Sequence, residues 1–440
     1  MDTLPKTFAL TTLGCKVNQE EGSALVGVFA EAGYALVDFS EPADIYIINT
    51  CTVTHLADRK SRRLIRRAHK QNPDALLIVC GCYAQGAPQE AASLPGVDIV
   101  AGVDERAGLL ALAEARLAQR EAAPLLAVAD LKEQRDFVSI GAGKSGQKRA
   151  RAYLKIEDGC DQFCHYCIVP QVRGPVRSLP LPFVLAQAEG LIAAGHREIV
   201  LSGIHIGAYG QGLPDGVDLA DAIKALLALP NLGRLRLSSL EPQHFDPKLL
   251  ALLKDQAKLC PHFHIPLQSG CDKTLKAMGR RYSLSQYQAV LNSLRSILPD
   301  PAITTDIIAG YPGESEEDFS QTLDFIKGLA FAGLHIFPYS PRPGTPAASF
   351  PDQVRPEDKQ RRAEELDIIG KILQENYAKK YLGQELRVLA EQQLEQDGQI
   401  YWSGHSANYL QVLWPSGEVS RGEFQVVIGK EYRDGCIFAE

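Results

Sequence analysis

Residues 159–167 read GCDQFCHYC and place three cysteines, Cys160, Cys164 and Cys167, at the spacing Cys-x3-Cys-x2-Cys. The stretch follows an apolar run, residues 153–156, that predicts a β-strand. An odd number of closely spaced thiols is a poor disulfide set, but three thiolates suit a metal ion or an iron–sulfur cluster. A zinc ion would need a fourth ligand nearby, whereas a four-iron cluster on three cysteines leaves one iron open to a substrate or cofactor. The alternative is three buried structural cysteines.

Composition limits the classes of protein that fit the chain. Its 440 residues, 45% of them hydrophobic, can bury several cores and suggest about three domains. The net charge of −7 means that any nucleic-acid site must be local. Ten cysteines without a secretory leader predict a reducing, cytoplasmic location. No apolar run approaches the ~20 residues of a membrane span, so we expect no membrane partner.

The N-terminal part predicts a parallel α/β domain, residues 1–130, with cysteines at its strand ends. Three strand-like runs lead into Cys15, Cys51 and the pair Cys80 and Cys82, and helical patterns over 19–32 and 57–70 separate them. Since ligands bind beyond the carboxyl ends of parallel strands, Cys15, Cys51 and Cys82 should converge at one edge. Cys80 lies inside its run and is expected in the core. The alternative is three unrelated core cysteines.

After an aperiodic linker, residues 131–149, the chain alternates strand and helix six times over residues 150–381. This count is short of the eight units of a closed barrel and predicts an open partial (βα)6 barrel. The last part, residues 382–440, has short alternating runs separated by turns, which predict a small all-β barrel. Strands of the central part are expected at 153–157, 198–201, 234–237, 262–266, 303–308 and 334–337, and its longer helices at 182–194, 219–229, 285–298, 315–331 and 357–380.

Two further sets of residues are candidates for binding. Polar residues at the ends of the central strands should meet at the rim of the barrel, where α/β barrels carry out chemistry, although each could equally be a turn residue. A basic stripe in the second N-terminal helix could contact RNA phosphates or be an ordinary solvated face. The rim set is Ser202, Gly203, Glu241 and Gln268, and the basic stripe is Arg59, Arg63, Arg66 and Lys70. Arg173 and Arg177 could neutralise an anionic ligand or lie on the surface.

The motifs resemble those of a known family. The triplet Cys160, Cys164 and Cys167 is similar to the signature of radical S-adenosylmethionine (SAM) enzymes. The blocks GCKVNQ (14–19), NTC (49–51) and GCYAQ (81–85) resemble the methylthiotransferases, and GCKVNQ is the form typical of the tRNA threonylcarbamoyladenosine members. Further matching blocks are IPLQSG (265–270), TDIIAGYPGE (305–314) and FPYSPRPGTPA (337–347).

This resemblance implies two four-iron four-sulfur clusters. One, on Cys160, Cys164 and Cys167, would bind SAM and cleave it to a radical; the other, on Cys15, Cys51 and Cys82, would supply or carry sulfur. Ser202 and Gly203 would bind the amino end of SAM, Glu241 its ribose or a substrate hydroxyl, and Gln268 would lie near the reacting base.

The resemblance also implies an activity and its partners. The expected reaction is methylthiolation of C2 of N6-threonylcarbamoyladenosine at position 37, in the tRNA anticodon loop, with two SAM molecules used per turnover. A reductant such as flavodoxin or ferredoxin, a monomeric state and a TRAM-like RNA-binding barrel are also expected.

Other activities remain open at this point. The acceptor could be N6-isopentenyladenosine in tRNA or a ribosomal-protein aspartate. A protein of a different class, a non-catalytic zinc-stabilised RNA-binding protein, would be colourless and contain zinc instead of iron.

Overall fold

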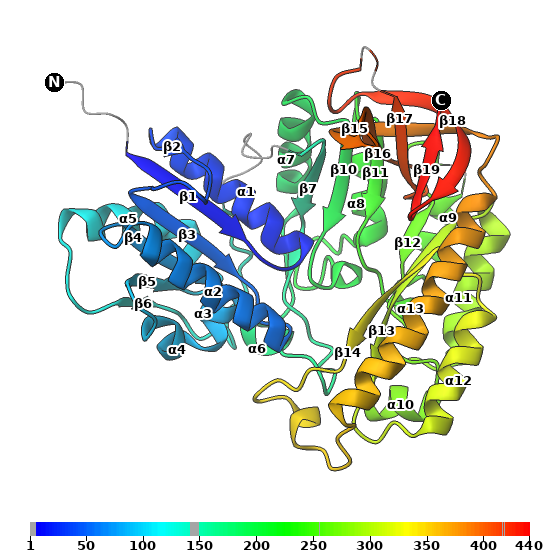
Figure 1. Ribbon diagram of the computed structural model, residues 1–440, viewed down its shortest axis with the longest axis horizontal. Coiled ribbons are helices and arrows are strands. Elements are labelled where there is room, and N and C mark those ends of the chain that lie inside the picture. The colour runs from blue at the N-terminus through cyan, green and yellow to red at the C-terminus, as the bar shows by residue number, and fades with distance from the viewer. Residues whose placement is uncertain (1–5, 141–148, 255, 416, 418) are drawn as a thin grey trace.

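The computed structural model describes residues 6–140, 149–254, 256–415, 417 and 419–440. Figure 1 shows the N-terminal α/β part on the left, the central part on the right and the C-terminal strands above it. Residues 141–148 of the expected linker lie outside the described residues. The observed fold confirms the fold class expected from the sequence; the limits between the parts stay a prediction.

The N-terminal part is a six-stranded parallel sheet in the order β2-β1-β3-β4-β5-β6. Its central strands are apolar throughout because both faces are covered: β3 packs Ile48 against Ile65 of α2, and Ile47 toward Leu25 of α1. The order of the strands reverses between β1 and β3, which marks the switch point where open α/β sheets bind ligands. The elements are β1 (Thr7–Thr12), α1 (Lys16–Glu31), β2 (Ala35–Leu36), β3 (Ile45–Thr50), α2 (His55–Gln71), β4 (Leu76–Gly81), α3 (Cys82–Gly86), α4 (Pro88–Ala92), β5 (Val97–Ala101), η1 (Glu105–Gly108), α5 (Leu109–Ala118) and β6 (Leu125–Ala127).

The central part has six parallel strands in two sheets, β11-β10-β7 and β12-β13-β14. Parallel pairings between Leu235 and Leu259 and between Ser239 and His264 connect the sheets into one open array. Helices cover its outer face. The elements are β7 (Arg151–Lys155), β8 (Glu157–Asp158), α6 (Val169–Arg173), β9 (Arg177–Ser178), α7 (Leu181–Ala193), β10 (Glu198–Ser202), η2 (Ile206–Ala208), α8 (Leu219–Leu227), β11 (Arg234–Leu237), η3 (Pro242–His244), α9 (Pro247–Leu253), β12 (His262–His264), α10 (Asp272–Ala277), α11 (Leu284–Ile297), β13 (Ala302–Ala309), α12 (Glu316–Lys327), β14 (Gly333–Pro338), η4 (Pro346–Ser349) and α13 (Pro356–Lys379).

Alternation along these strands separates an apolar outer face from a polar inner face. Leu154, Leu201 and Leu237 belong to the outer core. Side chains of the opposite parity face inward, and we call the space that they line the lumen. Its polar members include Arg151, Lys155, Glu198, Ser202, Arg234, Arg236, His262, His264, Thr304 and Asp306.

The C-terminal strands form a closed barrel in the order β15-β16-β17-β19-β18. Trp402 and Trp414 fill its core and are 7% and 4% exposed, so these two aromatic side chains are structural. Its elements are β15 (Glu385–Gln396), β16 (Gln399–Ser406), β17 (Gln411–Pro415), β18 (Phe424–Arg433) and β19 (Cys436–Ala439). The turn after β16 docks on the central part.

Most elements lie where the sequence predicts them, and the differences have local causes. The first helix begins at Lys16, earlier than expected, because Cys15 already has the extended backbone of an N-cap. The fourth central strand ends at His264, shortly before Pro266, which lacks the N–H that a strand ladder needs. Among the described residues, no helix is long and apolar enough to cross a membrane.

A buried ion-pair cluster fixes the C-terminal barrel to the central part. Glu198 pairs with Arg234 at 2.5 Å and with Arg236 at 2.8 Å. The same arginines donate to the carbonyl oxygens of His405 at 2.8 Å and Ser406 at 3.0 Å. Burial alone would raise the pKa of Glu198, but the arginines around it lower that pKa to about 2.

We expect Glu198→Gln to destabilise the protein in a pH-dependent way. A carboxyl with a depressed folded-state pKa contributes stability above its unfolded pKa of about 4.3, here on the order of 3 kcal/mol, and loses it as pH falls toward 2. The difference in the free energy of unfolding between wild type and variant should therefore be largest at pH 7 and should shrink below about pH 5. Urea unfolding of the apoprotein measures it. Glu375→Gln, at an exposed helix pair, is the matched control. A difference in the free energy of unfolding that does not change with pH would contradict the assignment of Glu198 as an ionised carboxylate paired with arginines.

Candidate iron–sulfur and cofactor site

The structure brings Cys15, Cys51 and Cys82 together at the carboxyl edge of the N-terminal sheet. Gly14 has φ +100°, and a Cβ there would lie 2.9 Å from the Cys51 Sγ, so only glycine lets this loop pass over Cys51. Burial, and then the charges of the neighbouring Cys82 and Cys15 thiolates, raise the pKa of Cys51 to about 12. Three sulfurs that repel one another as thiolates form a donor set suited to a cationic metal centre.

Cys80 does not join this trio. Its side chain is fully buried, and its thiol is 3.9 Å from Asn49 Oδ1. The interpretation of Cys80 as a core residue is therefore confirmed.

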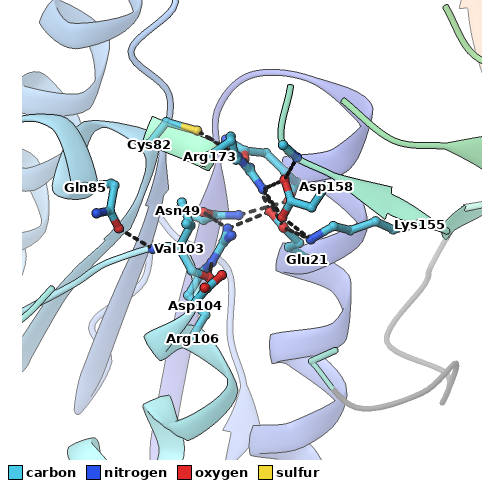
Figure 2. Close-up of polar contacts among 12 residues, drawn as sticks. Glu21, Asn49, Cys82, Gln85, Val103, Asp104, Arg106, Lys155, Asp158 and Arg173 are labelled. Carbon is cyan, nitrogen blue, oxygen red and sulfur yellow. Dashed lines mark hydrogen bonds and ion pairs between the residues drawn. The ribbon is translucent and has the colours of Figure 1, made fainter. Parts of the chain in front are cut away.

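A buried network connects the trio to the central part (Figure 2). Arg173, the last residue of α6, donates from Nε to Cys82 Sγ at 3.3 Å. Its Nη1 pairs with Glu21 of α1 at 2.7 Å and with Asp158 at 3.1 Å. Lys155 also binds both carboxylates, at 2.7 and 2.6 Å, and Arg106 binds Glu21 at 2.6 Å.

The charges of this network place a cation beside the Cys82 sulfur. Three cations, Arg106, Lys155 and Arg173, surround two carboxylates, so one positive charge remains for the sulfur that Arg173 contacts. Arg177 pairs with Asp104 at 2.6 Å and is 1% exposed. The surface alternative for Arg173 and Arg177 is therefore wrong; both belong to the interface between the N-terminal and central parts.

The second trio lies on the loop after β8. Gly159 has φ +92°, and a Cβ there would lie 1.9 Å from the Pro175 carbonyl oxygen. The Cys160 N–H donates to Gly174 O at 3.0 Å and the Cys167 N–H to Cys164 O at 2.9 Å, so the loop folds back on itself. Burial, and next the Cys164 thiolate, raise the pKa of Cys167 to about 12. The sulfurs of Cys160, Cys164 and Cys167 therefore lie together in one site, as those of the first trio do.

Arg280 is a site residue that the sequence did not indicate. Its Nη1 is 3.4 Å from Cys164 Sγ and 3.0 Å from Glu241 Oε1, and its side chain is 3% exposed. Its other terminal nitrogen, Nη2, is buried without a partner among the described residues. Because Arg280 and Cys164 are 116 residues apart, no spacing rule connects them.

Of the rim residues expected from the sequence, Glu241 is connected to this loop through Arg280, and the others lie at the ends of the central strands. Ser202 is fully buried, and its hydroxyl has no partner among the described residues. A Cβ at Gly203 would lie 2.6 Å from Oε2 of Glu157, whose other oxygen is likewise unpartnered within the described part. Gln268 has φ +67°, and its backbone pairs with Asp306 and Ile308.

These unpartnered polar atoms are the structural test of whether a cofactor fits. Buried polar groups are normally hydrogen-bonded, yet Ser202, Ser238, Glu157 and Arg280 each keep a buried polar atom without a partner among the described residues. Three thiols on one loop fit a cluster that leaves an iron open. The orphaned atoms fit a polar ligand bound beside it.

The basic stripe of α2 is exposed. Its four cations, Arg59, Arg63, Arg66 and Lys70, make no ion pair with a described residue. Helix α2 begins at His55, four residues after Cys51, so the stripe extends away from the first trio. Both earlier interpretations, an RNA contact and a solvated face, remain consistent with this position.

Solved structures show the same class of fold. The radical SAM methyltransferase TsrM from Kitasatospora setae superposes with a TM-score of 0.58 at 16% identity, over 78% of this chain and 77% of that chain. The radical SAM enzyme OxsB gives a TM-score of 0.51 at 15% identity, over 83% of this chain and 56% of that one. Family models match residues 154–326 as "Radical SAM superfamily" and residues 7–102 as "Uncharacterized protein family UPF0004". The fold and the cysteine loop define a radical SAM enzyme, a class that uses a four-iron four-sulfur cluster and SAM.

Similarity to curated proteins narrows the class. The threonylcarbamoyladenosine tRNA methylthiotransferase of Bacillus subtilis is 40% identical over 98% of this chain and 96% of its own length. The protein of the same name from Thermotoga maritima is 38% identical over 88% of this chain and 87% of its own length. A tRNA-2-methylthio-N(6)-dimethylallyladenosine synthase from Nitratidesulfovibrio vulgaris is 34% identical over 99% and 98%. The chain therefore belongs to the radical SAM methylthiotransferase family and is a transferase.

Proposed function

We propose that this enzyme methylthiolates C2 of N6-threonylcarbamoyladenosine at position 37, in the anticodon loop of tRNA. The observation that carries the proposal is the pairing of two cysteine trios across one interface. Arg173 ends the helix that begins two residues after Cys167, and it donates to the sulfur of Cys82. Relatives named for the threonylcarbamoyl substrate are 37–40% identical, and those named for the dimethylallyl substrate are 32–35% identical.

Each trio would hold one four-iron four-sulfur cluster. Cys160, Cys164 and Cys167 would hold the cluster that binds SAM, and Cys15, Cys51 and Cys82 the cluster involved in sulfur insertion. When bound, SAM supplies both the radical that removes hydrogen from C2 and, from a second molecule, the methyl group.

The residues around the loop have separate tasks in this proposal. Arg280 places its guanidinium beside the Cys164 sulfur and orients Glu241 by an ion pair at 3.0 Å. Ser202 and Gly203 line the place for the amino end of SAM, where a larger residue than glycine would strike Glu157. Gln268, held at φ +67°, would lie near the substrate base.

The proposal includes partners outside the chain. A reductant such as flavodoxin or ferredoxin would deliver electrons in the cytoplasm to a monomeric enzyme, and the C-terminal barrel would help to hold the RNA. The exposed stripe on α2 would contact tRNA phosphates.

We expect replacement of the stripe by glutamine to weaken tRNA binding without changing base preference. Four phosphate contacts contribute a slope of about 3 to the plot of log Kd against log salt concentration, so the quadruple variant should lose about that much slope. Fluorescence anisotropy between low and moderate salt measures it, and exposed lysines of α13, such as Lys371→Gln, serve as the control. An unchanged slope would mean that the stripe is a solvated face that does not contact tRNA.

The activity itself has a direct test. Reduced, cluster-reconstituted enzyme is incubated with SAM and tRNA carrying threonylcarbamoyladenosine, and the nucleosides are analysed by mass spectrometry. We expect a methylthio group on that nucleoside. Transfer only to tRNA carrying isopentenyladenosine, or to neither RNA, would reject the proposed substrate. Colourless protein with zinc would reject the catalytic proposal altogether.

A further inference from the structure

The loop after β14 reaches from the central part to the N-terminal part. Figure 1 shows it as the yellow chain that leaves β14 toward the blue N-terminal part. We call residues 340–347 of this loop, SPRPGTPA, the connecting segment. Its first half contacts residues that follow Cys51 of the first trio, and its second half contacts the loop that carries Cys164 and Cys167 of the second trio.

The first half of the connecting segment binds the chain directly after Cys51. Arg342 pairs through Nη2 with Oδ2 of Asp58 in α2 at 2.7 Å and donates to the Thr52 hydroxyl at 2.7 Å. That hydroxyl donates in turn to the other oxygen of Asp58 at 2.6 Å. Arg342, Asp58 and Thr52 are 6%, 6% and 3% exposed. These contacts are therefore shielded from water and hold Thr52, the residue next to Cys51, in one place.

The second half of the connecting segment binds the loop of the second trio. The Ala347 N–H donates at 2.9 Å to the carbonyl oxygen of His165, which lies between two cysteines of that loop. Gln171 of α6 donates from its side chain to the Gly344 carbonyl oxygen at 2.7 Å. One short segment thus contacts residues that neighbour cysteines of both trios.

The sequence of the connecting segment makes it stiff. Pro341 and Pro343 flank Arg342, and each proline fixes its own φ and restricts the residue before it. Gly344 has φ +82°, a conformation that favours glycine. Thr345 closes the turn by donating from its N–H and its hydroxyl to the Arg342 carbonyl oxygen, at 3.1 and 2.7 Å. A stiff segment of this kind imposes a fixed spacing on the two loops that it joins.

The buried pair of Arg342 and Asp58 specifies an arrangement more than it adds stability. Removing both charges from water costs free energy that their attraction only roughly offsets. Arg342 and Thr52 are 290 residues apart in sequence, so the contact determines how two distant parts of the fold meet. Arg173 binds the sulfur of Cys82 in the same trio. The two arginines therefore attach the first trio to the central part at two separate points.

We propose that Arg342 is a positioning residue that fixes the Cys51 loop, through Thr52 and Asp58, relative to the loop of the second trio. This inference rests on the proposed function, because it requires a cluster on the first trio. Reactions between positioned groups tolerate little displacement, since a shift of about 1 Å can cost about a hundredfold in rate. SAM cleavage needs only the second trio, so a displaced first trio should lower methylthiolation while SAM cleavage continues.

Arg342→Met tests the proposal in cluster-reconstituted enzyme with SAM and tRNA that carries threonylcarbamoyladenosine. We expect the ratio of 5′-deoxyadenosine to methylthio nucleoside to rise about tenfold or more, with unchanged iron content. Arg342→Lys keeps the charge but not the planar fork and should give a smaller rise. Arg355→Met, at an exposed ion pair with Asp358, should leave the ratio unchanged. An unchanged ratio in Arg342→Met, an equal loss of both products or a loss of iron would overturn the positioning role.

A second measurement needs neither RNA nor turnover. Pulsed electron paramagnetic resonance of the reduced enzyme gives the distribution of distances between its two clusters. We expect Arg342→Met and Asp58→Asn to broaden this distribution alike, and the double variant to broaden it no further, since both residues act through one contact.

The two measurements separate this inference from the proposed function. A distribution in Arg342→Met as narrow as that of the wild type would overturn the inference, even if the enzyme methylthiolates threonylcarbamoyladenosine. A wild type that does not modify this nucleoside, but whose narrow distribution Arg342→Met broadens, would reject the proposed substrate and support the inference. A wild type with only about four irons would reject both.

Discussion

The Cys82→Ala enzyme is expected to cleave SAM but to add no methylthio group, and to bind about four irons per chain where the two proposed clusters of the wild type would give about eight. Cys82 begins α3 and receives the Arg173 hydrogen bond, so its loss removes both a ligand and its stabilising contact. The backbone hydrogen bonds of the cysteine loop at 160–167 run to Gly174, Met278 and Cys164, and none of them involves Cys82. Iron analysis, release of 5′-deoxyadenosine and nucleoside mass spectrometry measure the three quantities separately.

Two variants complete this experiment. Cys164→Ala should lose SAM cleavage and methylthiolation together, since it removes a sulfur of the other trio. Cys80→Ala, two residues before Cys82 but buried in the core, should retain all iron and both reactions. If Cys82→Ala kept full iron and methylthiolation, or if Cys80→Ala behaved in the same way as Cys82→Ala, the assignment of the first trio would be wrong.

The meeting of Cys15, Cys51 and Cys82 could be predicted because parallel strands end at a common edge. That rule needs only the strand limits and the positions of the cysteines. The polar lumen could not be predicted in the same way. Arg234 and Arg236 alternate with leucines in a short run, and the sequence does not say which acid or carbonyl they meet. Glu198 and the turn at 405–407 lie far away in the chain.

Long-range charge contacts are the part that sequence reasoning missed. Arg173 could be recognised as a candidate, but its partners Glu21 and Cys82 are 152 and 91 residues away. Arg280 follows a short helix with no motif of its own. In both cases the partners of the arginine are decided by which elements pack together. The pattern of strands and helices in the sequence does not specify that packing between domains.

Arg173→Met is expected to lower stability and to weaken the first trio at the same time. Burial alone would raise the pKa of Glu21, yet the surrounding cations hold it well below its usual value, so Glu21 is an ionised, buried carboxylate. Removing one buried partner of such a group costs about 3–5 kcal/mol. Here Asp158 and the Cys82 sulfur lose the same donor.

The contrast among three variants separates these effects. Arg173→Lys keeps the charge but cannot bind Glu21 and Cys82 with one planar fork, so it should fall between wild type and Arg173→Met in apparent melting temperature. Arg361→Met breaks exposed ion pairs of α13 and should cost less than about 1 kcal/mol. A positive charge beside a cluster favours its reduced form, so the reduction potential of the first cluster should become more negative in Arg173→Met and much less so in Arg173→Lys. Loss of stability with an unchanged potential would limit Arg173 to a structural role, because packing alone does not alter the charge that the cluster experiences.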